Sequence, residues 1–304
     1  MNDETTAAKK TKLLAIDNLT VRIPLPGGAQ VHAATNINLD VNRGEIVAVI
    51  GESGCGKSIV ASAVAGILPP HAKTSGAVHY YYPDGQAFDI LARRSRTAKL
   101  AQTDRELAGK HIALIPQSAA TFLTPVRTIG AQLTETISVL GSEYSTSELL
   151  QRVRLDPEVG TLYPHEISGG MAQRAAVAFA LVGNPDLIIA DEPTASLDPE
   201  LTMNLLAMLH EIATEGVGVM LITHDITELR DSGIADRIAV MYASRFEETG
   251  TAEQVLRAPK SAYMRDLLAA LPENGLHPMP GTIPSLTNLP EDYCYERRLE
   301  VSHG

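Results

Sequence analysis

The residues from Gly51 to Ser58 have the types and the spacing that bind phosphate groups. The segment fits the pattern G-x-x-x-x-G-K-[ST] and reads Gly51, Glu52, Ser53, Gly54, Cys55, Gly56, Lys57, Ser58. Glycines let the main chain approach a phosphate closely, and the N-terminus of a following helix adds unpaired N–H groups. Lys57 would reach the β- and γ-phosphates, and the Ser58 hydroxyl would ligate Mg²⁺. The segment therefore predicts binding of a nucleoside triphosphate.

Cys55 lies inside this loop and has two interpretations. A thiol at a helix N-terminus can have a lowered pKa, which would allow a redox switch. Alternatively, Cys55 is a small residue that fills a serine-like position. We favour the second interpretation, because reactivity requires both exposure and a lowered pKa.

A second chemical motif is a short apolar run followed by two carboxylates. Residues 187–190 are Leu-Ile-Ile-Ala, and Asp191 and Glu192 come next. A strand delivers such residues to the carboxyl edge of a sheet, where α/β proteins bind ligands. Asp191 would hold Mg²⁺, and Glu192 would be the base that polarises an attacking water molecule. The alternative is an acidic N-cap on a following helix that begins near Pro193.

Composition limits the classes of protein that this chain can belong to. It has 304 residues, 25 Lys and Arg against 36 Asp and Glu, a net charge of −11 and 44% hydrophobic residues. The negative charge argues against nucleic-acid binding. Only two cysteines, Cys55 and Cys294, are present, which excludes a disulfide scaffold and predicts a reducing compartment. The longest strictly apolar run, 175–182, is far shorter than the roughly 20 residues of a spanning helix. Residues 1–12 contain no apolar segment of a secretory signal.

The order of the elements predicts a largely parallel sheet. Short apolar segments predict strands at 13–23, 31–41, 45–50, 78–82, 111–115, 187–190, 217–222 and 238–241. Helical patterns occur at 59–68, 129–155, 172–182, 201–215 and 254–271. This alternation is typical of an α/β protein. After Pro272 the chain becomes rich in Pro, Gly and Asn, and we expect either a poorly packed extension or an ordered irregular cap.

Four further motifs occur in a fixed order around these two. Gln117 follows the strand at 111–115, and Ser168, Gly169 and Gly170 precede an apolar helix; Asp198 and His224 come after the paired acids. With these motifs the chain resembles the ATP-binding subunits of ABC transporters. The resemblance covers about residues 13–304. It implies an α/β fold: a P-loop NTPase (RecA-like) core with an antiparallel β subdomain and a helical signature subdomain, plus a short C-terminal extension.

The resemblance also implies boundaries and residue roles. Residues 1–258 would form the ATP-binding domain, with the helical subdomain at about 119–178, and 259–304 the extension. Gln117 would contact Mg²⁺ or the attacking water, and His224 the γ-phosphate. Ser168, Gly169 and Gly170 would bind the γ-phosphate of ATP held by an opposing subunit. Asp198 would lie across the interface between the two subunits.

Further details resemble the branch that imports dipeptides, oligopeptides and nickel. They are the segment 119–130, Tyr163-Pro-His165, Met171 after the signature, and the tail from Ala262 to Pro290. The resemblance implies an ATP-hydrolysing subunit on the cytoplasmic face of the membrane, powering import of peptides, nickel or a related small solute. Expected partners are integral-membrane permeases, a second ATP-binding subunit and, indirectly, an extracytoplasmic solute-binding protein. A heterodimer is expected, and a homodimer stays open.

Two departures from the family pattern affect ligand binding. Many relatives carry a cysteine cluster in the tail that holds an iron–sulfur centre, whereas this tail has only Cys294, so no cluster is expected. The family often stacks an aromatic ring on adenine before the second strand. No aromatic residue occurs between Leu13 and Arg43, and Ile23, Val31 or His32 would pack there instead.

Two other functions remain as alternatives. An exporter ATPase is disfavoured by the importer-like tail. A soluble ABC ATPase acting on DNA or ribosomes is disfavoured because only 50 residues separate Gln117 from Ser168, with no sustained heptads, and because the chain has one ATPase unit. A basic patch at Arg93, Arg94, Arg96 and Lys99 would face lipid headgroups, RNA or, as we favour, solvent.

Overall fold

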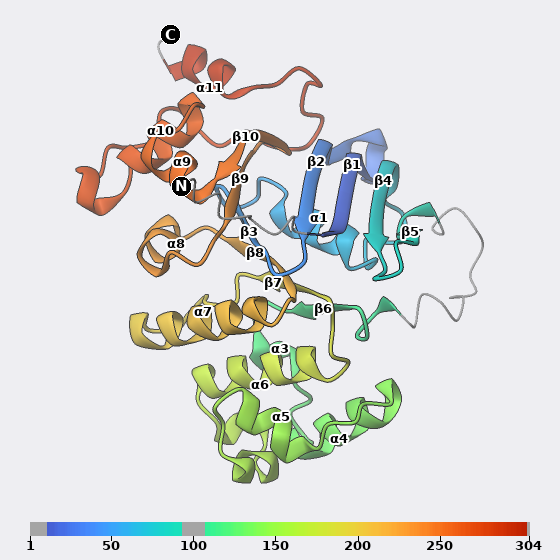
Figure 1. The fold of residues 1–304 in the computed structure, drawn as a ribbon. Coiled ribbons are helices and arrows are strands. Elements are labelled where there is room, and N and C mark those ends of the chain that lie inside the picture. The colour runs from blue at the N-terminus through green and yellow to red at the C-terminus, as the bar shows by residue number, and fades with distance from the viewer. Residues whose placement is uncertain (1–10, 93–106, 303–304) are drawn as a thin grey trace, which may run out of the picture.

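A six-stranded sheet and a four-stranded sheet share one core, and the helix at Lys57–Val64 packs between them (Figure 1). The structure is a computed structural model that describes residues 11–92 and 107–302. The strands are β1 (Lys12–Pro24), β2 (Gln30–Asn42), β3 (Ile46–Ile50), β4 (Lys73–Tyr81), β5 (Ala87–Asp89), β6 (Ile112–Ile115), β7 (Leu187–Asp191), β8 (Gly218–Thr223), β9 (Arg237–Tyr242) and β10 (Arg245–Thr251). The basic patch at 93–99 lies outside the described residues.

The longest helices in the described part of the chain are α7 (Pro199–Thr214), with 16 residues, and α6 (Gly169–Leu181), with 13. The others are α1 (Lys57–Val64), α3 (Ala119–Phe122), α4 (Ile129–Leu140), α5 (Thr146–Arg152), α8 (Ile226–Ser232), α9 (Ala252–Arg257), α10 (Ala262–Ala269) and α11 (Tyr295–Ser302). Short 3-10 turns occupy η1 (Pro26–Gly28), η3 (Pro157–Thr161), η4 (Pro164–Glu166) and η5 (Pro272–Asn274). None of the helices in the described part of the chain has the length and apolar character needed to span a bilayer.

The central sheet has the order β10-β9-β3-β8-β7-β6, and every pair except β10–β9 is parallel. Strands β3 and β8 are buried along their whole length, as expected for a parallel sheet covered on both faces. Their carboxyl ends therefore meet at one edge, which is where the phosphate loop begins. The predicted parallel sheet is confirmed. Strand β10 was not predicted, because Glu247, Glu248 and Gly250 interrupt its apolar pattern.

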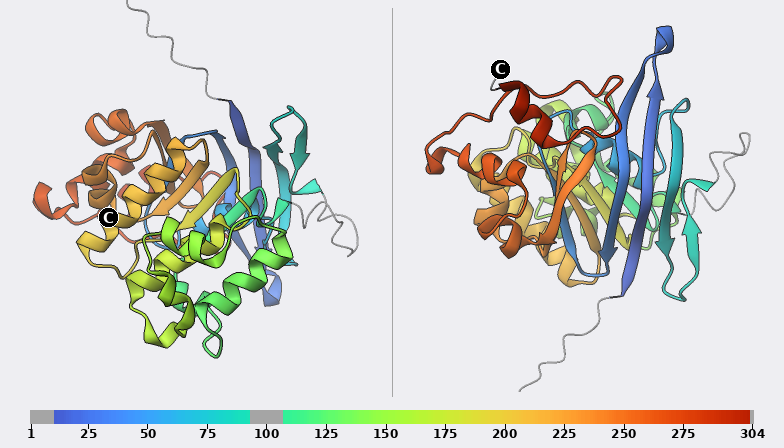
Figure 2. Two further views of the ribbon diagram at one scale, coloured as in Figure 1. Left: turned by 60° about the horizontal axis from the view of Figure 1, so that its bottom comes forward. Right: turned by 90° about the horizontal axis from the view of Figure 1, so that it is seen from above.

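The second sheet is antiparallel, with the order β2-β1-β4-β5. Leu14, Leu19 and Val21 of β1 are fully buried and belong to one core with α1 and the central sheet. Strand β2 is an edge strand of this sheet. In Figure 2 the long strands β1 and β2 run beside the C-terminal segment.

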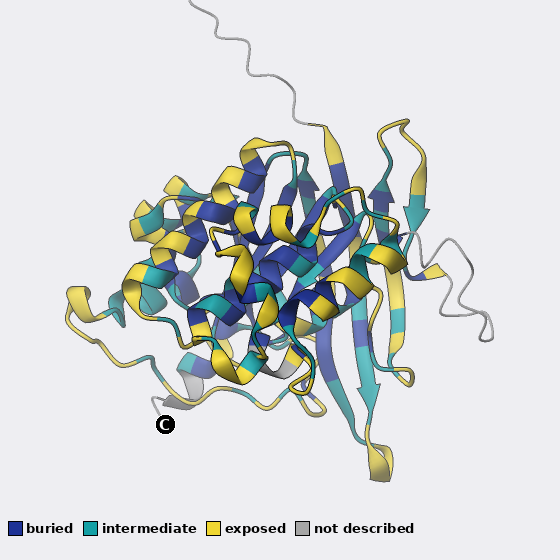
Figure 3. Cartoon of the chain, turned by 90° about the horizontal axis from the view of Figure 1, so that it is seen from below, coloured by how far each residue is buried: buried dark blue, intermediate teal, exposed yellow. Residues whose placement is uncertain are grey.

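The helices α3 to α6 gather at one end of the molecule, below α7 and β6 in the view of Figure 1. Buried residues line their inward faces and exposed residues their outward faces (Figure 3). The helix predicted at 129–155 is two helices, because Gly141 ends α4 in a left-handed conformation and Ser145 caps α5. Likewise 254–271 divides into α9 and α10 at Ala258, where the backbone leaves the helical region.

The segment after Pro272 is an ordered cap over the edge of the central sheet. Tyr295 of α11 packs against Tyr242 of β9 and Tyr263 of α10, with ring centroids 5.2 and 5.1 Å away. All three side chains are fully buried. Of the two interpretations for this tail, the ordered irregular cap is confirmed within the described residues, and a poorly packed extension is wrong.

Candidate nucleotide-binding site

The phosphate loop connects β3 to α1 and takes its shape from three glycines. Gly51, Gly54 and Gly56 all have positive φ angles, of 152°, 80° and 115°. A Cβ on Gly56 would lie 2.2 Å from the carbonyl oxygen of Ala33, and one on Gly51 would lie 2.0 Å from that of Met241. Nothing lies within 4 Å of the Cβ position of Gly54. Gly51 and Gly56 therefore allow the main chain at Met241 and Ala33 to pack closely against the loop. The Cβ position of Gly54 instead faces open space.

Lys57 is buried, and its ammonium group bonds to the loop itself. Its Nζ donates to the carbonyl oxygens of Gly51 and Glu52, at 2.7 and 3.1 Å. These hydrogen bonds hold the positive charge of Lys57 against the main chain of the loop that would bind the phosphates. The Lys57 ammonium group is therefore positioned at the phosphate loop.

Cys55 is only 4% exposed. Burial raises the pKa of its thiol, against the opposing effect of the nearby Lys57 charge. A protonated, buried thiol is a poor nucleophile. The geometry therefore favours the interpretation of Cys55 as a small structural residue.

Asp191 lies at the end of β7 and faces the loop. The Ser58 hydroxyl donates to Asp191 Oδ1 at 3.3 Å. Burial raises the pKa of the Asp191 carboxyl, and the Ser58 hydrogen bond opposes that rise. A hydroxyl and a carboxylate side by side are the oxygen ligands that Mg²⁺ prefers, so the donor set fits this ion.

Glu192 contacts two other residues that the sequence analysis singled out, Gln117 and His224. Gln117 Nε2 donates to Glu192 Oε2 at 2.8 Å, and His224 Nδ1 lies 3.3 Å from Glu192 Oε1. Glu192 has φ of 46°, a left-handed conformation that is uncommon outside glycine and often marks functional residues. Its N–H donates to the carbonyl of Ile222, which fixes this turn against β8.

The interpretation of Asp191 and Glu192 as an N-cap is wrong. The following helix, α7, begins at Pro199, and its N-cap is Asp198, whose side chain accepts from Leu201 N at 2.9 Å. The acids instead end a strand, which directs them to the sheet edge.

The phosphate loop, Gln117 and Glu192 line one cleft with a volume of about 430 Å³, whereas Asp191 and His224 are not among its lining residues. This volume is within the usual range for small-molecule sites, about 300–1,000 Å³. The cleft is lined by Ile23, Val31, Ala33, Ser53, Gly54, Gly56, Lys57, Ser58, Ile59, Gln117, Glu192 and Leu286. Of the three residues expected to pack on adenine, Ile23 and Val31 line the cleft, and His32 is not among its lining residues. Sequence reasoning missed Leu286, since no local pattern places a residue of the tail here.

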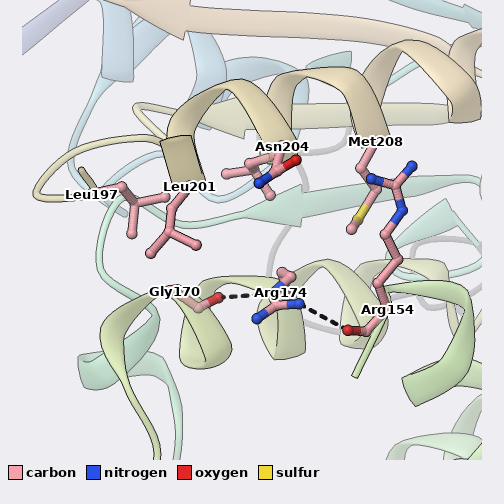
Figure 4. Close-up of a pocket in the computed structure, with 8 residues that line it drawn as sticks. Arg154, Gly170, Arg174, Leu197, Leu201, Asn204 and Met208 are labelled. Carbon is pink, nitrogen blue, oxygen red and sulfur yellow. Dashed lines mark hydrogen bonds between the residues drawn. The ribbon is translucent and has the colours of Figure 1, made fainter. Parts of the chain in front are cut away.

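Ser168, Gly169, Gly170 and Asp198 are not among the residues that line this cleft. Ser168 is exposed and caps α6, accepting from Met171 N at 3.2 Å. Gly170 belongs to a second pocket, between α6 and α7, where Leu201 lies over it (Figure 4). A Cβ on Gly170 would lie 2.7 Å from Leu201 Cδ1. Arg174 also lines this pocket and donates to the carbonyls of Gly170 and Arg154, at 3.4 and 2.8 Å (Figure 4).

Comparison with known proteins gives consistent matches. Residues 34–195 match the family profile described as "ABC transporter". The chain is 37% identical to the dipeptide transport ATP-binding protein DppD of Bacillus subtilis, over 92% of this chain and 84% of that protein. It is 35% identical to the probable D,D-dipeptide transport ATP-binding protein DdpD of Escherichia coli, over 92% and 88%. The fold resembles that of a dimeric ATP-binding cassette in a post-hydrolysis state bound to ADP and Pi. That likeness has a TM-score of 0.64 at 24% identity and covers 79% of this chain and 99% of that one.

Proposed function

Because this chain belongs to the ABC transporter family, as an ATP-binding protein of the dipeptide and oligopeptide branch, we propose that it hydrolyses ATP to power import of a small solute. The solute is a peptide, nickel or a related compound. Peptides are favoured because the relatives named above are called dipeptide transport proteins. The exporter, DNA and ribosome alternatives have no such support.

The observation that carries this proposal is the contact of Gln117, Glu192 and His224 beside the phosphate loop. Glu192 would accept a proton from the attacking water, and Gln117 would orient that water. Lys57 would exchange its carbonyl contacts for phosphate oxygens. Mg²⁺, held by Ser58 and Asp191, would supply positive charge to the β- and γ-phosphates.

A second ATP-binding subunit is part of the proposal. Ser168, Gly169 and Asp198 are exposed and do not line the cleft of their own chain. Small residues at the N-terminus of α6 suit the γ-phosphate of ATP held by an opposing subunit. We expect the opposing subunit to be a different chain, with a homodimer as the alternative.

Contact with permease subunits would involve the segment after Gln117. Within it, Phe122 is 49% exposed and Val126 is 80% exposed. Exposed apolar side chains on one segment suit contact with another protein. The chain would then sit peripherally on the cytoplasmic face of the membrane, with a solute-binding protein acting on the other side. Residues 1–258 would form the ATPase unit, including the helical subdomain at about 119–178, and 259–304 its extension.

The test is solute uptake in cells that lack this chain. Uptake of a labelled dipeptide should be restored by the wild-type chain but not by Lys57→Ala. Lys73→Ala changes an exposed lysine at the start of β4 and serves as the matched control, which should restore uptake. Radioactive nickel is tested in parallel. Equal uptake of both solutes with Lys57→Ala and with wild type would contradict the proposal.

A further inference from the structure

The C-terminal segment returns to the edge strand of the antiparallel sheet. His32 N donates to the carbonyl of Leu286 at 2.9 Å, and Asn288 N donates to the carbonyl of Gln30 at 2.8 Å. Val31 and Thr287 form an antiparallel bridge between these two bonds. The Asn288 side chain adds a third bond, accepting from Gln30 N at 2.9 Å. Edge strands offer unpaired main-chain groups, and here the tail occupies part of that edge.

This pairing brings the side chain of Leu286 into the nucleotide cleft. Leu286 lines it together with Ile23 and Val31 from the facing strands β1 and β2. Among the described residues that line the cleft, none is aromatic. The large apolar residues of its lining are therefore all aliphatic, and one of them, Leu286, comes from the tail.

Ion pairs on the C-terminal side hold the segment in place. Glu291 accepts two hydrogen bonds from Arg22 Nη2, at 2.9 and 3.0 Å. Further along, Arg298 donates to the Glu52 carboxylate of the phosphate loop at 2.7 and 3.3 Å. Arg298 also donates to the carbonyl of Pro280 at 2.6 Å, which closes the segment into a loop. Leu286 is thus positioned by contacts on both sides.

We propose that this segment closes the base end of the nucleotide site, with Leu286 packing on the face of the adenine ring. The inference rests on the proposed function, since it takes the ligand of the cleft to be ATP. The phosphate loop lines the cleft with Ser53, Gly54, Gly56, Lys57 and Ser58, so the phosphates would bind there and the base would reach the other lining residues. Ile23, Val31 and Leu286 offer the apolar surface that a flat ring buries favourably.

The test compares ATP with tripolyphosphate, which carries the phosphates but no base. Binding of each is measured to the purified full-length chain by calorimetry. Leu286→Ala should weaken ATP binding about five- to tenfold, as expected from the apolar contact that it removes. It should leave tripolyphosphate binding unchanged. Leu286→Met, which keeps a side chain of similar size, should keep the wild-type affinity for ATP.

Ile283→Ala is the matched control, because Ile283 lies in the same segment, is 53% exposed and is not among the residues lining the cleft. It should bind ATP as the wild type does. Unchanged ATP binding in Leu286→Ala, or an equal loss for ATP and tripolyphosphate, would overturn the inference. The proposed function fails separately, if the wild-type chain binds ATP no better than Lys57→Ala does.

Discussion

Arg298 and Glu52 form an ion pair that joins the C-terminal helix to the phosphate loop, across 246 residues of sequence. The Arg298 side chain is 3% exposed and that of Glu52 is 14% exposed. The guanidinium also lies 5.8 Å from the ring centroids of Tyr242 and Tyr295. The tail is therefore attached to the loop that would hold the phosphates.

Removing one partner of this pair should destabilise the fold, because the other charge stays partly buried without compensation. We expect Arg298→Gln to lower the free energy of unfolding by about 2–4 kcal/mol. Glu52→Gln should also be destabilising, and the double variant should lose less than the sum of the two. Urea denaturation measures all four proteins. Strictly additive losses would show that the two residues are not coupled.

The phosphate-loop glycines should differ in their tolerance of a side chain. Gly56→Ala places a Cβ against the Ala33 carbonyl and should lower the unfolding temperature markedly. Gly54→Ala meets no atom within 4 Å, so only its backbone strain, about 1 kcal/mol, should destabilise the fold. Thermal denaturation without nucleotide compares them, and equal losses would argue against this packing.

Cys55 should resist modification in the folded chain. Burial keeps its thiol protonated near neutral pH, whereas Cys294 is partly exposed. Mass spectrometry after brief alkylation at neutral pH should find Cys294 modified before Cys55, with ATP hydrolysis unchanged. Rapid alkylation of Cys55, or loss of activity after mild oxidation, would restore the redox hypothesis.

Glu248 should make stability depend on pH. Burial tends to raise the pKa of its carboxyl, but hydrogen bonds from the N–H groups of Ser261 and Lys260 outweigh burial and lower the pKa. A lowered folded pKa gives stability that is present above the ordinary carboxyl pKa, about 4.3, and lost as the pH falls through the folded value.

Glu248→Gln should therefore be less stable than wild type by about 1–2 kcal/mol at pH 7. The difference should shrink as the pH falls below about 4. Urea denaturation at several pH values checks this. A difference that stays constant over the whole range would contradict the role of the charge.

Local sequence patterns predicted the central sheet and the residues at its edge. Asp191 and Glu192 end a buried strand, and Gln117 follows another, so a parallel sheet brings them to one edge. The contact of Gln117 with Glu192 was not predicted, and it depends on the left-handed turn at Glu192.

The tail shows what local patterns cannot predict. Leu286 lies at the cleft because main-chain hydrogen bonds join the tail to Gln30 and His32. Arg298 pairs with Glu52, which is 246 residues away in the sequence. Such contacts depend on the tertiary arrangement of distant segments. Irregular segments rich in proline and glycine carry no periodicity that would indicate which face they cover.

Glu192 is the residue proposed to accept a proton from the attacking water during ATP hydrolysis in this cleft. The most direct measurement is the ATP hydrolysis rate of Glu192→Gln, together with its ATP affinity and its state of association. We predict a rate at least about 100-fold below wild type, retained ATP binding and a nucleotide-dependent dimer that persists. Normal turnover in Glu192→Gln would show that Glu192 is not the base.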